Sequence, residues 1–183
     1  MAEDWKAEVL DFWFGELSPE QWFDSTSELD QTMRERFGAL HERIASALPV
    51  EAQEDARAAL AAIIALDQFP RNMFRGTAQA FASDNQAVAL ARNAVARGLD
   101  ADLAPEERQF LYMPLMHSEV VADQEHCVSL FADLENSEGL RYAEEHRDIV
   151  ARFGRFPHRN KPLDRESTPE ERDFLKGHAG YGQ

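Results

Sequence analysis

The stretch EAQEDARAALAAIIALDQFPRNMFRG, residues 51–76, decides the fold. Its alanine-rich part predicts a helix over residues 51–69, with Ile63 and Leu66 on the inner side. Pro70 has no backbone N–H and disfavours helical geometry in the residue before it. We therefore expect the helix to stop near Pro70.

Helical periodicity continues on both sides of this stretch. Apolar residues recur at spacings of three and four from Leu29 to Leu48, and Gly15 ends an earlier helix. Residues 71–83 are expected to be a loop or broken turn. Further helix boundaries are signalled by N-cap residues, first-turn prolines and C-terminal glycines: Ser18-Pro19, Asp84 with Gly98, Ala104-Pro105, Ser118, Ser137 with Gly154, and Thr168-Pro169. Pro114, inside an apolar run, should kink or end its helix.

Strand signals do not occur, since there is no sustained alternation of polar and apolar residues and no Asn-Gly hairpin. The pattern predicts an all-α fold, an antiparallel array of about eight or nine helices with short connections. A chain of 183 residues is most simply one domain, residues 1–183, and can bury a core without disulfides.

Composition limits the possible partners. A net charge of −15 argues against nucleic acid, because the phosphate backbone would be repelled. The single cysteine, Cys127, cannot form an intramolecular disulfide, which fits the cytosol. The N-terminus does not resemble a signal peptide, and no apolar run approaches the ~18 residues of a membrane span. We expect a cytoplasmic protein with neither a membrane nor a nucleic-acid partner.

The most basic part of the chain is residues 146–160, called the basic island below. It holds four arginines and one acid and carries a charge of +3. Since the whole chain carries −15, the rest of the chain carries −18. Phe153 and Phe156 alternate with the arginines, and Gly154 and Pro157 occupy turn positions, unlike a disordered basic tail. The pattern predicts an ordered loop whose guanidinium groups converge on something anionic.

A second polar group surrounds Pro70. Arg71 and Arg75 are placed to grip a carboxylate or phosphate, with Asp67 ionised and paired beside them. Alternatively, Asp67 pairs with one arginine and Asn72 merely shapes a turn. The predicted ligand-binding residues of both groups are Asp67, Gln68, Arg71, Asn72, Arg75, His146, Arg152, Arg155, Arg159 and Asn160. The arginines among them outnumber the nearby acids Asp67 and Asp148, and Glu119 balances at most one more, so a net positive pocket is expected if the arginines converge.

A third polar group follows Pro114. His117 and Glu119 are suited to act as acid–base partners, and with His158 they make up the predicted catalytic residues. The alternative for His117 is a core histidine that donates to a backbone carbonyl. His146 shares the buried face of its helix and is equally explained as a satisfied core residue.

Other kinds of site find little support. A metal site would draw on His117, Glu119, His146, Asp148 and His158. Their spacing matches no metal-binding motif, so no metal is predicted, and no cofactor can be assigned. Walker, GxGxxG and GxSxG motifs are absent. Cys127 lies mid-helix among apolar residues and is predicted to be inert.

Several motifs carry a family resemblance. They are LDFWFG at 10–15, LDQFPRN at 66–72 with Arg75-Gly76, FASD at 81–84, FLYMP at 110–114, HSE at 117–119, RFGRFPHRN at 152–160 and STPEE at 167–171. Together they resemble the uncharacterised bacterial family catalogued as domain of unknown function 924, over nearly the whole chain. The resemblance implies a helical fold similar to tetratricopeptide-repeat proteins, and it implies no activity. Asp164 stands where the family has glycine, which leaves the turn after Pro162 open.

Two hypotheses follow. In the first, the three polar groups meet in one pocket that binds a small anionic ligand, a carboxylate or phosphate, and in a stronger form acts on it as an enzyme. In the second, the helical array is a peptide- or protein-binding scaffold whose polar network is structural. Convergence of the three groups in one cleft favours the first, and separate solvent-facing arginines favour the second.

Overall fold

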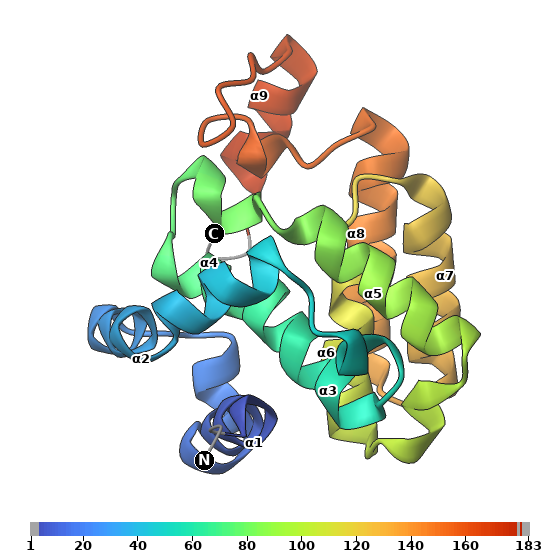
Figure 1. Ribbon diagram of the computed structural model, residues 1–183. Coiled ribbons are helices and arrows are strands. Elements are labelled where there is room, and N and C mark those ends of the chain that lie inside the picture. Colours follow the sequence, from blue (N-terminus) through green and yellow to red (C-terminus); the bar gives the residue numbers. More distant parts are fainter. Residues whose placement is uncertain (1–3, 179, 181–183) are drawn as a thin grey trace.

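A helical rod runs through the middle of the molecule (Figure 1). The computed structural model describes residues 4–178 and residue 180. The rod comprises α3 (Ala56–Ile63), a π-helical segment (Ile64–Gln68) and α4 (Phe69–Met73). All of residues 58–73 are buried. The predicted helix is present, but it begins after the N-cap Asp55, and the expectation that it stops near Pro70 is wrong.

Two side chains from other helices explain why Pro70 does not end the rod. Because proline has no N–H, position 70 can serve neither the carbonyl of Ala65 nor that of Leu66, the two acceptors that a π-helical or an α-helical bond from this position would reach. The Nδ1–H of His41, on α2 (Ser27–Ser46), donates to the Ala65 carbonyl at 2.9 Å. The Ser83 hydroxyl donates to the Leu66 carbonyl. The buried carbonyls are thus satisfied from outside the rod.

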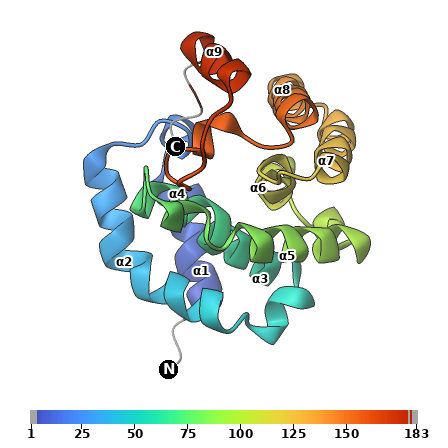
Figure 2. The same cartoon turned by 90° about the horizontal axis from the view of Figure 1, so that it is seen from above.

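The remaining helices surround the rod (Figures 1 and 2). They are α1 (Trp5–Leu10), which continues into a π-helical segment (Asp11–Glu16), α2, α5 (Asp84–Ala96), α6 (Pro105–Met116), α7 (Val121–Asp133), α8 (Ser137–Phe153) and α9 (Pro169–Gly177). α1 and α2 contact one side of the rod, and α5 and α6 contact the other. α7 and α8 pack outside α6, and α9 lies against the turn at Pro157–Arg159.

Several predicted boundaries are confirmed. Gly98 and Gly154 follow α5 and α8 with φ of 70°, in the left-handed region that glycine adopts at low cost. Thr168 caps α9 through a capping box with Glu171. Asp164 also has a positive φ, of 52°, so the turn expected of a glycine is kept there with an aspartate.

Other boundaries differ from the prediction. α7 begins after Val120, not Ser118, and the Ser118 hydroxyl instead accepts from the Val120 N–H. Asn136, not Ser137, caps α8 by accepting from the Gly139 N–H at 2.9 Å. Pro114 is accommodated inside α6, which ends two residues later. The region 71–83, expected as a loop, begins with the end of α4 and includes a 3₁₀ turn at Ala78–Phe81. Gly15 lies inside the π-helical segment Asp11–Glu16 and does not end it.

Aromatic packing joins the N-terminal helices to the rod. The Phe37 ring of α2 lies 4.6 Å from that of Phe69 and 4.8 Å from that of Phe12, measured between centroids. Trp13 contacts Phe69 at 5.9 Å and Phe110 of α6 at 5.4 Å. All five side chains are at most 2 % exposed, so this cluster fixes α1, α2 and α6 around the rod.

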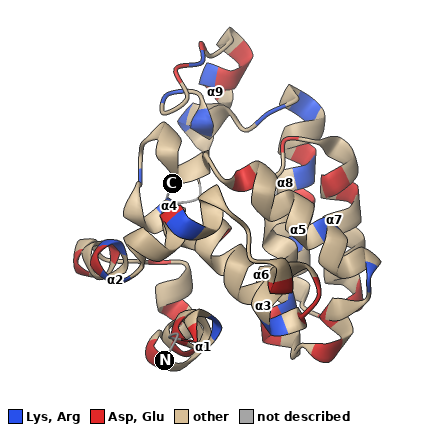
Figure 3. Ribbon diagram, viewed as in Figure 1, with Lys and Arg blue, Asp and Glu red and all other residues tan. Residues whose placement is uncertain are grey.

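The prediction of an all-α fold is confirmed: the described residues contain helices and no strand. Similarity to tetratricopeptide-repeat proteins stays a prediction. No helix in the described part is long and apolar enough to span a bilayer. Charged residues cover the outer helices, whereas the rod is mostly uncharged apart from a patch at α4 (Figure 3).

We expect Gly139→Ala to destabilise the protein by about 1–3 kcal/mol, although alanine favours helices. A Cβ on Gly139 would lie 2.7 Å from ring carbons of the buried Phe131. The matched control is Gly38→Ala, within α2, where a Cβ meets nothing within 4 Å and should stabilise by about 0.5–1 kcal/mol. Urea unfolding of the two variants measures the difference, and stabilisation by both would refute the steric argument.

Candidate functional site

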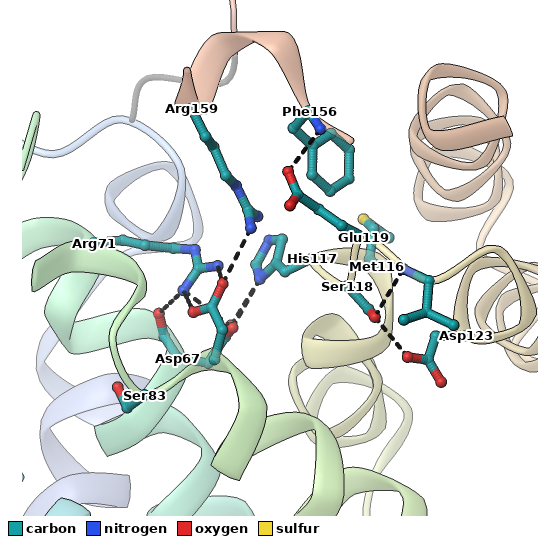
Figure 4. Close-up of polar contacts among 12 residues, drawn as sticks. Asp67, Arg71, Ser83, Met116, His117, Ser118, Glu119, Asp123, Phe156 and Arg159 are labelled. Atoms are coloured by element: carbon teal, nitrogen blue, oxygen red, sulfur yellow. Dashed lines mark hydrogen bonds and ion pairs between the residues drawn. The ribbon is translucent and has the colours of Figure 1, made fainter. Parts of the chain in front are cut away.

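The segment before Pro70 and the end of α6 meet in a buried carboxylate–imidazole pair (Figure 4). Asp67 lies in the π-helical segment and is 0 % exposed, and His117 directly follows α6 and is 7 % exposed. Nδ1 of His117 is 2.9 Å from each carboxylate oxygen of Asp67. Two of the three predicted polar groups therefore come together.

The basic island contributes Arg159 to the same cluster. Arg71 makes a bidentate ion pair with Asp84, both contacts at 2.9 Å, and its Nη1 is 3.1 Å from an Asp67 oxygen. Nη1 of Arg159 contacts Asp84 at 3.2 Å. The Arg159 guanidinium lies 4.7 Å from the ring centroids of both Phe81 and Phe156. Asp84, at the start of α5, thus holds together arginines from two predicted groups.

Asp67 is ionised in this environment. Burial alone would raise its pKa, but the neighbouring Arg71 guanidinium and His117 hold the pKa of Asp67 below its usual range. Nη1 of Arg71 also donates to the Asp67 backbone carbonyl at 2.6 Å, and the Gln68 amide donates to the carboxylate. The expectation that Asp67 is ionised and paired with an arginine is met.

His117 is neutral near pH 7. Burial and the positive charges of Arg71 and Arg159 lower the pKa of His117, against the opposing influence of Asp67. Because Nδ1–H donates to the Asp67 carboxylate, the lone pair of the neutral ring is on Nε2. Within the described part of the chain Nε2 accepts no hydrogen bond, so His117 presents a base held in one tautomer.

A cleft of about 670 Å³ opens beside His117. Predicted site residues that line it are Gln68, Arg71, Asn72, Arg75, His117 and His146. Asp67 and Arg159 are not among the residues that line it. At the rim, Asp30 of α2 accepts from the Asn72 amide at 2.9 Å and from Nε of Arg75 at 3.0 Å. The ring centroids of His146 and His117 are 6.4 Å apart.

Three predicted residues of the basic island fix α9 and do not line the cleft. Arg152 pairs with Glu170 at 2.8 Å, and Arg155 pairs with Glu171 at 2.7 Å. The Asn160 amide donates to Glu171 at 3.2 Å. The hydrogen bond from Arg155 lowers the pKa of Glu171 to about 2.

The other two predicted catalytic residues also have structural partners. Glu119 accepts from the Phe156 N–H at 2.8 Å and pairs with Arg165 at 2.8 Å, which ties the island loop to the connection between α6 and α7. Nε2 of His158 lies 2.9 Å from Nδ1 of His178, whose Nε2 contacts Glu145 at 2.7 Å. Burial and the nearby His178 and Arg159 lower the pKa of His158 to about 4. His158 itself is not on the cleft wall, although His178 is.

The expected excess of arginines over acids is wrong. Each arginine has a carboxylate partner that the sequence count missed: Asp84 for Arg71 and Arg159, Asp30 for Arg75, Glu170 for Arg152 and Glu171 for Arg155. The polar wall is therefore close to electrically balanced. Asp84 belongs to the FASD motif, so its sequence context could have marked it as a candidate site residue. Nothing in the sequence indicated that Asp30 pairs with Arg75.

The apolar part of the cleft was not predicted from the sequence. It is lined by Trp22, Phe23, Met113, Met116, Phe131 and Tyr142. Among the described residues, no group of three or more histidine, cysteine, aspartate or glutamate side chains is placed to hold a metal ion. Cys127 is fully buried, and burial raises the pKa of its thiol, consistent with the inert role expected of it.

Fold and site together define an all-helical protein in which a buried Asp–His–Arg cluster borders a cleft. The chain belongs to the family described as bacterial protein of unknown function, DUF924, whose pattern it matches over residues 9–179. It is similar to a solved structure of a protein of unknown function, ATU0120 from Agrobacterium tumefaciens, with 43 % identity, a TM-score of 0.89, and coverage of 94 % of this chain and 97 % of that one. No curated protein matches the chain.

Asp67→Ala should lower the free energy of unfolding by about 3–5 kcal/mol, because it removes one of the two carboxylates that pair with the buried Arg71 guanidinium. The control Asp148→Ala, whose side chain is 69 % exposed, should change it by less than about 0.5 kcal/mol. Since the pKa of Asp67 is lowered on folding, its stabilisation is complete above pH ~4 and is lost as pH falls further. Denaturant unfolding at pH 7 and pH 3 should show the gap between wild type and variant shrinking in acid. An equal effect of the two substitutions would mean that Asp67 is not a buried partner.

Proposed function

We propose that the cleft binds a small anionic molecule, a carboxylate or phosphate compound, and that His117 acts on it as a general base. The observation that carries the proposal is the state of His117. Its imidazole is neutral, its Nδ1–H is held by Asp67, and the residue lines the cleft. This arrangement places a base beside a space large enough for a metabolite.

The chemistry that fits is proton transfer. A proton from an O–H or C–H group of the bound molecule, or from a water beside it, moves to Nε2 of His117. The ionised Asp67 then stabilises the imidazolium through the Nδ1–H bond, as an orienting carboxylate does in a Ser-His-Asp triad. Arg71, paired with both Asp67 and Asp84, keeps the carboxylate in position.

Arg71 and Arg75 on the cleft wall, with the amides of Gln68 and Asn72, supply the donors for an anionic group. Because the wall is nearly balanced in charge and the whole chain carries −15, attraction must come from short-range contacts and not from a long-range field. We place the protein in the cytoplasm, which suits its single buried thiol.

One observation favours a different class of function. Every arginine of the predicted site already has an acidic partner, as expected of a structural network in a peptide- or protein-binding scaffold. The convergence of Asp67, Arg71, His117 and Arg159 beside the cleft supports the small-molecule proposal instead. Native mass spectrometry of the purified protein separates the two, since a co-purified small acid supports the first and its absence with a bound peptide supports the second.

Carboxylates and phosphate esters should raise the melting temperature, because a ligand that binds the folded state stabilises it by mass action. At a concentration of 100 Kd the gain is about 2.7 kcal/mol, or several degrees for a chain of this size. Arg75→Gln should reduce the shift, whereas the control Arg57→Gln, a 57 % exposed arginine outside the cleft, should leave it unchanged. Stabilisation by cations alone, or equal shifts in both variants, would contradict anion binding.

The base itself can be tested by NMR without knowing the substrate. The His117 ring should be the neutral Nδ1–H tautomer at pH 7 and should titrate below pH 6.5. Asp67 raises the pKa of His117, so Asp67→Asn should move the titration to still lower pH. Ring-nitrogen shifts recorded against pH measure both effects. A His117 ring that is cationic at pH 7 would rule out its role as the base.

A further inference from the structure

We infer that the ligand of this cleft is amphipathic: its anionic group lies at the Arg71–Arg75 wall, and an aryl or acyl group lies against Phe23 and Tyr142. The inference rests on the proposed function and deepens it, because it names the substrate class of the same site.

Exposed aromatic side chains gather at this cleft. Among the described residues, the large hydrophobic side chains that stay exposed are Phe23, Val50, Val120, Val121 and Tyr142. The two aromatic ones, Phe23 at 64 % and Tyr142 at 38 % exposure, both line the cleft, and none of the three valines does. Exposed aromatic surface that borders a cavity marks a place where an apolar group is buried on binding.

Two aromatic residues of the apolar wall, Phe23 and Trp22, pack against the core. The Phe23 ring stacks on the buried Phe110 ring at 6.3 Å with an interplanar angle of 16°. Trp22 donates from Nε1 to the Trp13 carbonyl at 2.7 Å, and its ring meets Phe110 edge-on at 5.1 Å. These contacts anchor the wall to the core, so little conformational entropy is lost when an apolar group binds there.

Tyr142 links the apolar and polar parts of the cleft. Its backbone carbonyl accepts from Nδ1–H of His146, and both residues lie on α8 and line the cleft. The Arg141 guanidinium lies 4.6 Å from the Tyr142 ring centroid, which supports the ring from the same helix. Since Tyr142, His146 and His117 line the same cleft, a molecule with its apolar group against Tyr142 can place its polar end on the side of His146 and His117.

The size of the cleft agrees with a two-part ligand. A volume of about 670 Å³ falls within the range of roughly 300–1,000 Å³ typical of metabolite and drug sites. Inorganic phosphate or acetate would occupy only the polar end. The methionines Met113 and Met116, whose flexible side chains adapt to ligand shape, line the remaining space.

Isothermal titration calorimetry with two probe series tests the inference. The first series is acetate, butyrate, hexanoate and 3-phenylpropionate, and the second is inorganic phosphate and phenyl phosphate. Affinity should rise about four-fold for each methylene that is buried. Phe23→Ala and Tyr142→Ala should remove most of this gain while leaving acetate binding unchanged. Val50→Ala, an exposed site of the same kind outside the cleft, should behave as wild type.

The outcomes separate the inference from the proposed function. If acetate and hexanoate bind with equal affinity and Arg75→Gln weakens both, the anion site stands and the amphipathic ligand is refuted. If 1-hexanol binds as tightly as hexanoate, the anionic end is refuted and with it the proposed function. A gain along the series that Phe23→Ala and Tyr142→Ala leave intact would place the apolar group elsewhere and overturn the assignment. Circular dichroism of each variant confirms that it is folded.

Discussion

The missing N–H of Pro70 is the constraint on which the rest of the structure depends. Position 70 offers no donor to either carbonyl within its helical reach, those of Ala65 and Leu66, and both are bonded by donors from outside the rod. His41 from α2 and Ser83 from the start of α5 supply them, so the helices on either side are tied to one break in backbone hydrogen bonding. The same π-helical segment carries Asp67, and such segments are frequent at functional sites.

Electrostatic balance within the buried cluster has a chemical effect. Arg71 and Arg159 bring two positive charges, and Asp67 and Asp84 bring two negative ones. Burial and the positive charges of Arg71 and Arg159 outweigh the effect of Asp67 and lower the pKa of His117, so the ring stays a neutral base beside this cluster. We expect a buried ionic cluster of this kind to add little to the net free energy of unfolding and instead to favour one arrangement of its side chains. Replacing all four residues by hydrophobic ones would test this expectation.

Local signals in the sequence were sufficient for much of the fold. Gly98, Gly154 and Thr168 mark helix ends by backbone geometry and capping, which act within a few residues. The continuation through Pro70 could not be read in this way, because it depends on His41 and Ser83, which are distant in sequence. The partners of the arginines were missed for the same reason: Asp30 reaches Arg75 across 45 residues. The meeting of Asp67 with His117 agrees with the hypothesis that the polar groups converge, because partly buried polar side chains need one another as partners.

The π-helical segment also sets the rotational phase of the residues that follow it. Each residue of an α-helix advances by about 100° around the axis. One residue fewer between Ile64 and Gln68 would allow a regular α-helix and would turn Arg71 and Asn72 by about that angle. Side chains that now face the cleft would then face the packed core. The wall is thus specified by the length of this segment as well as by its composition, and an insertion or deletion here would shift the wall residues out of phase.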